Sequence, residues 1–280
     1  MKLIIGKHAG FCFGVRRAAE EAFACARDKK SCVTLGPLIH NPQEVARLKK
    51  EGIPSVETLE EVQPGKTVII RSHGVAPDIY EEADKRGIPI IDLTCPHVAW
   101  IHNLVKKETA DGTALILVGE AEHPEMKGIA GWAGGQVIVL NSEEEAHKVD
   151  IPEKAIVIAQ TTIRQDRYEA VLRVLEKKNP NIRIYNTICK ATGLRQQEAE
   201  ELSQSVQVMV VVGGKNSSNT NKLFETCHQR CPRSILVETP EDILEGFICA
   251  EDTVALTAGA STPQWLLDKV AERITQMGTR

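Results

Sequence analysis

The sequence has no apolar run that approaches the roughly 18 residues a membrane-spanning helix needs. The apolar stretch at its start, residues 1–6, is too short for a signal peptide, so we expect a cytoplasmic protein that does not bind membranes. The charge also lacks a strong excess of one sign, because the formal net charge is -4 and Lys and Arg are scattered. A nucleic-acid binder usually carries a basic patch, so no nucleic-acid partner is expected.

Two nucleotide-binding signatures are missing as well. No G-x-G-x-x-G follows an expected strand, and the loop Gly213-Gly214-Lys215-Asn216 lacks the earlier glycine and the Lys-Ser/Thr end of a P-loop. NAD and ATP are therefore poor candidates as ligands. No Ser/Gly/Pro-rich linker or low-complexity tract interrupts the chain, so any subdomains should pack tightly together.

Three evenly spaced cysteines, Cys12, Cys95 and Cys189, are the most informative feature that is present. Each follows a short apolar, strand-like stretch and precedes a helix-like segment. A thiol near a helix N-terminus is biased toward the thiolate, the form that binds metal or attacks an electrophile. The spacing predicts one central site built from three similar units, residues 1–94, 95–188 and 189–280, in which the N-terminal strand is able to pack with another unit.

The other five cysteines are left out of the expected site. Cys227 and Cys231 resemble half of a zinc motif, but no matching second pair accompanies them. Cys25, Cys32 and Cys249 lie in helix or strand patterns, where a free cysteine usually serves as a small buried hydrophobe. In a chain without a secretion signal we expect reduced thiols.

Apolar runs of four to six residues alternate along the chain with longer amphipathic stretches. Continuous apolar strands between helices indicate parallel sheets covered on both faces, so the predicted fold class is α/β throughout. The expected strands include residues 68–71, 115–118, 137–140, 156–159, 208–212 and 254–257, and the expected helices include residues 44–51, 78–87, 168–178 and 266–277.

Polar side chains follow six of the expected strands, at the points where ligands bind in open parallel sheets. His, Ser, Thr and Asn can donate hydrogen bonds to phosphate oxygens, and helix starts add backbone amides. Any one such residue is more often a helix N-cap, but their repetition at equivalent points favours a cradle for an anion. The clusters are centred on His40, His73, His123 to Glu125, Gln160 to Thr162, Asn216 to Asn219 and Ala258 to Ser261.

Two cofactors are compatible with this set of residues, which consists of three thiolates, the acid Glu125 and an anion-binding cradle. Three cysteines could hold zinc with an open fourth position, or an iron-sulfur cluster with one iron free. A zinc hydrolase needs a metal-activated water and usually a general base, whereas an open cluster iron could bind a substrate oxygen and pass electrons to it. Residue types alone do not decide between them, although the spread over three units slightly favours the larger cofactor.

Nine short motifs run in order along nearly the entire chain: residues 10–15, 38–41, 71–75, 94–96, 123–125, 160–162, 188–192, 216–219 and 257–261. Together they resemble the motifs of the 4-hydroxy-3-methylbut-2-enyl diphosphate reductase family, which catalyses the last step of the non-mevalonate isoprenoid pathway. The resemblance implies three α/β subdomains with mainly parallel sheets around a central 4Fe-4S cluster. It also implies an allylic diphosphate substrate, isopentenyl and dimethylallyl diphosphate as products, and a ferredoxin or flavodoxin type electron donor.

The same resemblance implies a role for each motif residue. Cys12, Cys95 and Cys189 would hold three irons and leave the fourth for the substrate hydroxyl. Glu125 and Thr161 would orient that hydroxyl and relay protons. The diphosphate would be bound by His40, His73, His123, Ser217, Ser218, Asn219 and Ser261, with imidazolium side chains offsetting its charge.

A non-catalytic iron-sulfur sensor that binds a diphosphate is the alternative from another class. It would need the cluster and the cradle, but neither Glu125 nor Thr161. Two positions depart from the family pattern: Trp100 replaces an expected basic residue after Thr-Cys-Pro, and Gly193-Leu194 replaces a polar pair. Neither departure touches a motif residue, so they concern the surface on which an electron donor would dock.

Overall fold

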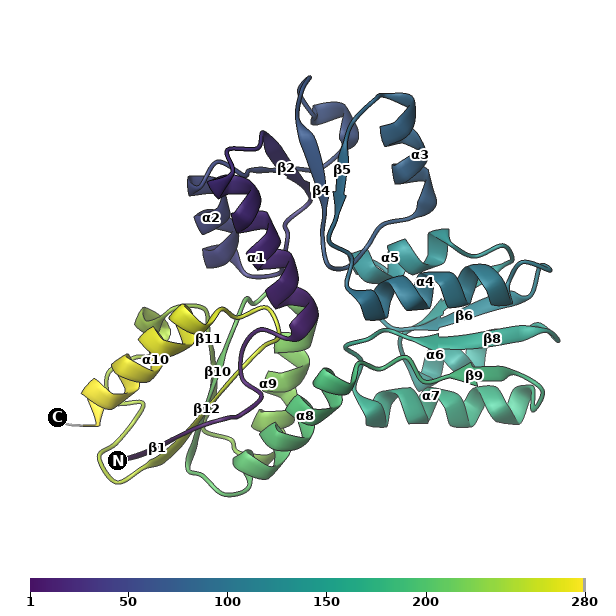
Figure 1. The fold of residues 1–280 in the computed structure, drawn as a ribbon. Coiled ribbons are helices and arrows are strands. Elements are labelled where there is room, and N and C mark those ends of the chain that lie inside the picture. Colours follow the sequence, from purple (N-terminus) through teal and green to yellow (C-terminus); the bar gives the residue numbers. More distant parts are fainter. Residues whose placement is uncertain (279–280) are drawn as a thin grey trace. The chain divides into compact units, whose positions relative to one another are not determined.

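Three parallel four-stranded sheets form the framework of this computed structural model, which describes residues 1–278 (Figure 1). The strands are β1 Lys2–Ile5, β2 Cys32–Leu35, β3 Ser55–Val56, β4 Thr67–Ile70, β5 Ile90–Asp92, β6 Ala114–Val118, β7 Val137–Leu140, β8 Ala155–Ala159, β9 Arg183–Tyr185, β10 Val208–Val212, β11 Ser234–Val237 and β12 Thr253–Ala258. The predicted α/β class is confirmed, and every strand expected from the sequence is present.

The helices follow the strands in alternation, and every helix expected from the sequence is also present. They are α1 Phe13–Arg27, α2 Pro42–Lys50, α3 Pro77–Lys85, α4 Pro96–Glu108, α5 Pro124–Gly131, α6 Glu143–Lys148, α7 Gln165–Lys178, α8 Lys190–Ser203, α9 Ser218–Arg230 and α10 Gln264–Met277. Two short 3₁₀ helices, η1 Leu59–Glu61 and η2 Pro240–Asp242, complete the set within the described residues.

All three sheets have the same topology. Their strand orders are β3-β2-β4-β5, β7-β6-β8-β9 and β11-β10-β12-β1. In each sheet the chain runs from the first central strand to an edge and then returns to the other central strand. The strand order therefore reverses between the two central strands, and such a switch point leaves a crevice for ligands at the carboxyl ends of the strands.

The fourth strand of each sheet precedes one of the three cysteines. Cys95 follows β5, Cys189 follows β9, and Cys12 follows β1, which pairs with β12 from the opposite end of the sequence. The third sheet thus takes its fourth strand from the start of the chain. For this reason the first of the three equivalent cysteines lies at position 12, and the other two follow at near-equal intervals.

The chain divides into two compact units. One contains residues 1–16, 39–47 and 190 onward, with the sheet β11-β10-β12-β1. The other contains residues 17–38 and 48–189, with the two remaining sheets. The division into three subdomains at residues 94 and 188 stays a prediction.

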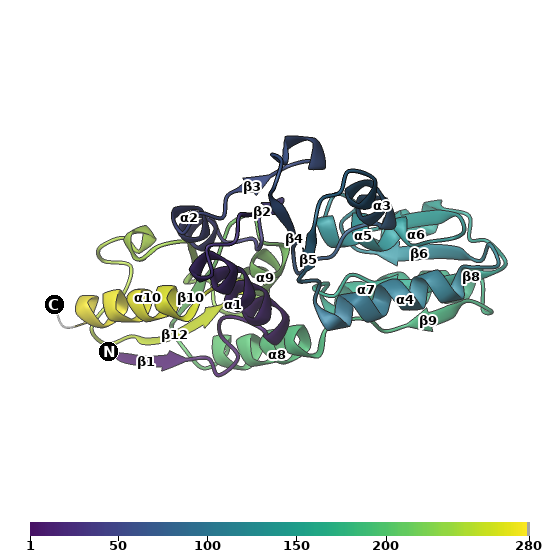
Figure 2. The ribbon, with the colours of Figure 1, turned by 45° about the horizontal axis from the view of Figure 1, so that its top comes forward.

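The central strands are buried along nearly their whole length, which explains their continuous apolar sequences. Every residue of β6, β8 and β10 is buried. Helices α4 and α5 cover one face of the β6–β8 sheet, and α6 and α7 cover the other. On the sheet that contains β10 and β12, α10 covers one face, as Figure 2 shows, and α8 and α9 cover the other.

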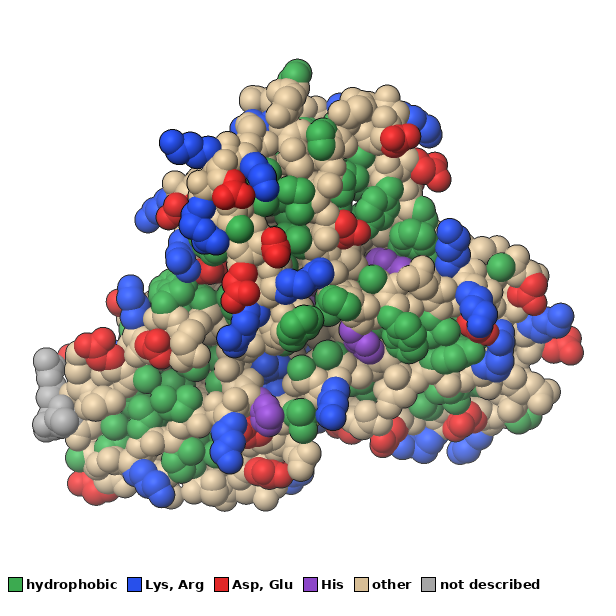
Figure 3. Space-filling model, viewed as in Figure 1, with side chains coloured by type: hydrophobic (Ala, Val, Ile, Leu, Met, Phe, Trp, Pro, Cys, Tyr) green, Lys and Arg blue, Asp and Glu red, His purple; other side chains and the backbone are tan. Residues whose placement is uncertain are grey.

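Charged side chains of both signs are intermixed on the face of the molecule shown in Figure 3, as the small net charge suggests. Trp100 and Leu194, the two departures with large side chains, are 48% and 39% exposed. Among the described residues, none of the helices is both long enough and apolar enough to cross a membrane.

His102 is a buried histidine that packs beneath the loop containing His73. Its ring stacks on Trp132 with centroids 5.4 Å apart. Gly74 has φ +70°, and a Cβ there would lie 2.4 Å from His102 Cε1, so only glycine fits. Burial lowers the pKa of His102 from 6.5 to about 4, although the nearby Asp92 raises it. The imidazole is therefore neutral at neutral pH.

We expect the free energy of unfolding to decrease as the pH falls from 6.5 toward 4. The unfolded chain protonates this imidazole near its ordinary pKa, whereas the folded chain does so only near the lowered one. The contribution of His102 is therefore complete above about pH 6.5 and is lost below it. By about pH 5, wild-type protein should have lost about 2 kcal/mol more than His102→Gln in urea unfolding. Equal losses in the two proteins would contradict a buried neutral His102.

Candidate active site

The structure divides the predicted site residues evenly between the two units. The unit with β10 and β12 contains Cys12, His40, Ser217, Ser218, Asn219 and Ser261. The unit with β4, β6 and β8 contains His73, Cys95, His123, Glu125, Thr161 and Cys189.

Glu125 and Thr161 form a buried pair across the switch point between β6 and β8. Thr161 donates its backbone N–H to Glu125 Oε1 at 2.8 Å and its hydroxyl to Oε2 at 2.7 Å. Glu125 is 3% exposed and Thr161 is 6% exposed. Both carboxylate oxygens thus accept hydrogen bonds from the same residue, and such charge-assisted bonds fix the orientation of the carboxylate. The two residues predicted to act together are therefore hydrogen-bonded to each other, and their roles stay a prediction.

The residue that holds Glu125 also holds the loop of Cys189. The Thr161 carbonyl oxygen accepts a hydrogen bond from the Cys189 N–H at 3.0 Å. Two residues earlier, the Thr187 side chain accepts from Ala159 N at 2.8 Å and donates to Ala159 O at 2.6 Å. The segment leading to the thiol is therefore fastened to the end of β8 at two points, so the position of Cys189 follows that of Thr161.

The Cys95 loop is fastened to the end of β4 in a similar way. Cys95 donates its N–H to the Ser72 carbonyl at 3.0 Å. The preceding residue, Thr94, bonds through its N–H and hydroxyl to Asp92 Oδ1, and its carbonyl accepts from the Arg17 guanidinium at 2.6 Å. Because Cys95 is the N-cap residue of α4, its thiol lies at the positive end of a helix dipole.

His97 connects the two thiol-bearing segments of this unit. Its Nε2 lies 3.0 Å from the Thr187 carbonyl oxygen. A carbonyl can only accept, so Nε2 carries the proton. His97 lies two residues after Cys95, and Thr187 lies two residues before Cys189. The ring of His97 also stacks on the exposed ring of Trp100 at a centroid distance of 5.6 Å. Trp100, which departs from the family pattern, therefore contacts a residue next to the Cys95 loop.

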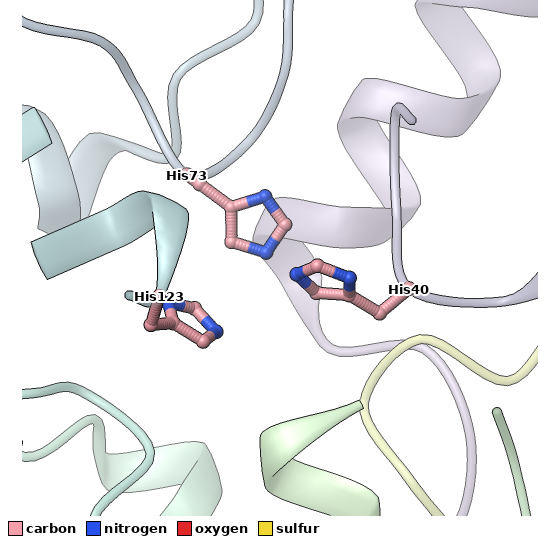
Figure 4. Close-up of side chains that lie close together, drawn as sticks. All are labelled: His40, His73 and His123. Atoms are coloured by element: carbon pink, nitrogen blue, oxygen red, sulfur yellow. The ribbon is translucent and has the colours of Figure 1, made fainter. Parts of the chain in front are cut away.

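His73 and His123 lie beside each other at the ends of β4 and β6 (Figure 4). Their rings meet edge to face with centroids 5.5 Å apart. His123 is the N-cap residue of α5, and its Nδ1 accepts a hydrogen bond from the Glu125 N–H at 3.2 Å. An accepting Nδ1 carries no proton in this geometry, and the imidazolium expected beside a bound diphosphate stays a prediction. The capping bond leaves Nε2 as its donor, with the ring neutral.

In the other unit, a buried arginine organises the loop of Cys12. Arg195, on α8, donates to the carbonyl oxygens of His8 at 2.9 Å and of Gly10 at 2.8 Å. It is 3% exposed. Cys12 itself donates its N–H to the Ala260 carbonyl at 3.2 Å, next to the predicted ligand residue Ser261. The Cys12 loop is therefore held between α8 and the end of β12.

Three consecutive polar residues begin α9, and they differ in what their side chains do. Ser217 is the N-cap residue, and its hydroxyl accepts from the Thr220 N–H at 3.3 Å. Ser218 Oγ accepts from Lys222 Nζ at 2.7 Å. Asn219 is 8% exposed, and its buried Nδ2 has no hydrogen-bond partner among the described residues. The capping interpretation therefore fits Ser217, whereas Asn219 has a donor group ready for a ligand.

Ser261 and His40 are linked at the end of β12. The Ser261 hydroxyl donates to the His40 carbonyl oxygen at 3.1 Å, so it fixes the loop that carries the His40 ring. In this geometry the Ser261 proton points toward the backbone. A diphosphate contact by this hydroxyl would require it to rotate.

Burial separates the three predicted ligand cysteines from the others. Cys12, Cys95 and Cys189 are half-buried, and each lies directly before or at the start of a helix. Cys25, Cys32, Cys227 and Cys231 are buried, as expected for small hydrophobes. Burial also raises the pKa of Cys227 to about 12, with Cys231 adding to the shift, which disfavours the thiolate that zinc would need.

The prediction for Cys249 is wrong, because this residue is exposed. It lies outside any helix or strand, just before β12. Its N–H donates to Asp252 Oδ2 at 2.7 Å. The apolar pattern of the adjacent residues Phe247 and Ile248 belongs to the turn that packs on α10 and β12.

Comparison with known proteins identifies the family of this chain. A family model described as LytB protein matches residues 3–275. The chain belongs to the LytB protein family. A LytB-family relative from Geobacter metallireducens is 43% identical over 277 residues, which cover 99% of this chain and 98% of the relative. One from Caldanaerobacter subterraneus is 40% identical over 281 residues, covering 99% and 98%. Both are named 4-hydroxy-3-methylbut-2-enyl diphosphate reductase.

Two solved structures agree with the LytB assignment. One, described as (E)-4-hydroxy-3-methyl-but-2-enyl diphosphate reductase, the terminal enzyme of the non-mevalonate pathway, is 39% identical with a TM-score of 0.73. It covers 99% of this chain and 100% of its own. The E-1-hydroxy-2-methyl-but-2-enyl-4-diphosphate reductase from Plasmodium falciparum is 29% identical with a TM-score of 0.92, covering 98% and 88%. The family resemblance inferred from the sequence is confirmed.

Sequence reasoning missed several residues that shape the site of this LytB-family chain. Arg195 and His97 hold the cysteine loops through contacts with backbone carbonyls, which leave no motif in the sequence. Lys222 had one usable signal, since it lies four residues after Ser218 and therefore on the same helix face.

Proposed function

We propose that this chain reduces 4-hydroxy-3-methylbut-2-enyl diphosphate to isopentenyl diphosphate and dimethylallyl diphosphate, the last step of the non-mevalonate isoprenoid pathway. The substrate takes up two electrons and two protons, its allylic C–O bond breaks, a C–H bond forms, and the oxygen leaves as water. The observation that carries the proposal is the buried Glu125–Thr161 pair, in a chain that matches reductases of this name over its full length.

The three half-buried cysteines fit a 4Fe-4S cluster. Thiolates are the usual ligands of such clusters, and each of these half-buried cysteines lies directly before or at the start of a helix. Cys12, Cys95 and Cys189 would hold three irons. When bound, the cluster supplies the electrons and an open iron that acts as a Lewis acid on the substrate oxygen.

Glu125 and Thr161 supply the protons in this proposal. A hydroxyl both donates and accepts, so the Thr161 proton points to Oε2 only while Glu125 is ionised. When Glu125 is protonated at Oε2, it becomes the donor, and Thr161 can turn its own proton toward the substrate oxygen. The pair therefore passes a proton outward with only a rotation of one hydroxyl.

The polar residues at the strand ends bind the diphosphate. Asn219 offers its Nδ2, His123 offers its Nε2, and the start of α9 adds backbone amides with partial positive charge. His40, His73, Ser217, Ser218 and Ser261 complete the predicted set. The proposal also includes a cytoplasmic location and a ferredoxin or flavodoxin type electron donor, both inferred from the sequence and its resemblance.

A sensor that only binds a diphosphate would have no use for the proton pair. Detecting the two product diphosphates after incubation of anaerobic protein with substrate and reductant tests the proposed reaction. The diphosphate-binding part is tested separately, by titration with inorganic diphosphate.

Asn219→Ala should weaken the binding of inorganic diphosphate by roughly tenfold to a hundredfold, because a charge-assisted hydrogen bond contributes about 1.5–3 kcal/mol. Calorimetric titration of anaerobic protein measures this. Asn221→Ala is the matched control, since the Asn221 side chain donates to the Lys215 backbone carbonyl at 2.8 Å. The control should bind diphosphate as wild type does. Unchanged affinity in Asn219→Ala would remove this residue from the site.

A further inference from the structure

Lys222 is a lysine that lies buried near the start of α9. It is 3% exposed, and its Nζ donates to Ser218 Oγ at 2.7 Å. Lysine is almost never fully buried, because removing an ammonium group from water is unfavourable. Its position adds a second cost, since the start of a helix has a partial positive charge that repels a cation. A buried ammonium within two turns of a helix N-terminus is stabilised when an anion binds there.

The contact with Ser218 determines what that hydroxyl can do. An ammonium group has three donors and no acceptor, so Ser218 Oγ must be the acceptor in this pair. The Ser218 hydroxyl therefore keeps its proton directed away from Lys222. The next residue, Asn219, has a buried Nδ2 without a partner among the described residues, so the first turn of α9 presents this donor beside the Ser218–Lys222 pair.

We propose that Lys222 is a positioning residue for the diphosphate: it holds the Ser218 hydroxyl in place by donating to its oxygen, and it supplies positive charge behind the first turn of α9. This rests on the proposed function, in which Ser217, Ser218 and Asn219 bind the diphosphate. His123 does not supply this charge in the present geometry, since its Nδ1 accepts the capping bond from the Glu125 N–H. Lys222 never needs to touch the ligand, because it acts through Ser218 and through its field in a buried environment.

Lys222→Met tests the role, because methionine fills similar space without a charge. Inorganic diphosphate should bind anaerobic Lys222→Met roughly tenfold to a hundredfold more weakly than wild type in calorimetric titration. Lys222→Arg keeps the charge and should recover most of the affinity. In the Ser218→Ala background, Lys222→Met should cost less than in wild type, because part of its effect passes through Ser218.

Lys215→Met is the matched control for charge. Lys215 belongs to the loop before the same helix but is exposed, and its removal should change the affinity by less than about threefold, because exposed charges are screened. A melting curve for each variant separates binding from stability. If Lys222→Met melts at a lower temperature but binds diphosphate as wild type does, Lys222 is structural and the inference is wrong.

The Asn219→Ala variant distinguishes failure of this inference from failure of the proposed function. If Asn219→Ala loses affinity and Lys222→Met does not, the diphosphate site stands and only the role of Lys222 is overturned. If neither substitution changes the affinity, diphosphate does not bind at the start of α9, and both are overturned. If Lys222→Met fails to fold, Lys222→Gln replaces it. The diphosphate affinity of Lys222→Gln is then compared with that of wild type, and the same substitution is tested in the Ser218→Ala background.

Discussion

Replacing Cys12, Cys95 or Cys189 with serine should abolish or severely reduce iron binding. Wild-type protein isolated without oxygen should be brown and contain about four irons and four sulfides per chain, as a cluster held by cysteine thiolates requires. Serine is nearly isosteric but offers a hydroxyl instead of a soft thiolate. Each of the three cysteines donates its backbone N–H to a carbonyl in the loop that follows a strand, and serine keeps this bond, so the substitution removes a ligand without removing the loop.

The remaining cysteines provide the controls for this experiment. Cys249→Ser changes an exposed thiol and should retain full iron and sulfide. Cys231→Ala changes a buried thiol that lies 3.4 Å from the Gln207 carbonyl, so it should affect stability rather than iron content. Stoichiometric zinc without sulfide in the wild-type protein would contradict the iron-sulfur proposal and favour a zinc enzyme.

Glu125→Gln should lower turnover by roughly 100-fold or more, which is the range for loss of a general acid. Glutamine keeps the shape of the side chain and can still accept from the Thr161 N–H at the position of Oε1. Its amide cannot deliver a proton to Thr161. Substrate affinity should therefore change little while kcat falls, which identifies a group that acts in the chemical step.

Glu122→Gln is the matched control, three residues earlier and in the loop that precedes α5. Glu122 is an exposed carboxylate whose pKa is lowered by its hydrogen bond and ion pair with Lys127, and it should be dispensable for turnover. If Glu125→Gln retains near-normal turnover, the proton comes from another donor. A sensor function would leave diphosphate binding intact in both variants and show no turnover in the wild type.

The framework of this protein was predictable because its signals are local. Continuous apolar runs marked β6, β8 and β10, and polar residues after the strands marked the carboxyl edges of the sheets. The topology then brings those edges to switch points, so residues 36 positions apart, such as Glu125 and Thr161, become neighbours. The spacing of the cysteines reflects the strand order that all three sheets share. In the third sheet β1, from the start of the chain, occupies the edge position that β5 and β9 occupy in the other two.

The contacts that hold the cysteine loops were not predictable, because they join distant segments through backbone atoms. Arg195 lies 185 residues from Gly10, whose carbonyl it binds, and His97 lies 90 residues from Thr187. No periodicity or motif records such bonds. The N-cap role of His123 was missed for a related reason, since its Nδ1 accepts from a helix N–H that is apparent only once α5 is formed. For Cys249 the sequence pattern was misleading. The apolar residues before it belong to a turn and not to a helix or strand, so the thiol is exposed.

Product analysis tests the central claim most directly. Anaerobic protein with a complete cluster is incubated with 4-hydroxy-3-methylbut-2-enyl diphosphate and a low-potential reductant, and the diphosphates are separated and identified. The proposed function predicts that both isopentenyl and dimethylallyl diphosphate appear, that neither appears without reductant, and that two electrons are consumed per substrate. Intact substrate after incubation with protein that contains full iron and sulfide and binds the substrate would contradict the reductase function and favour a sensor.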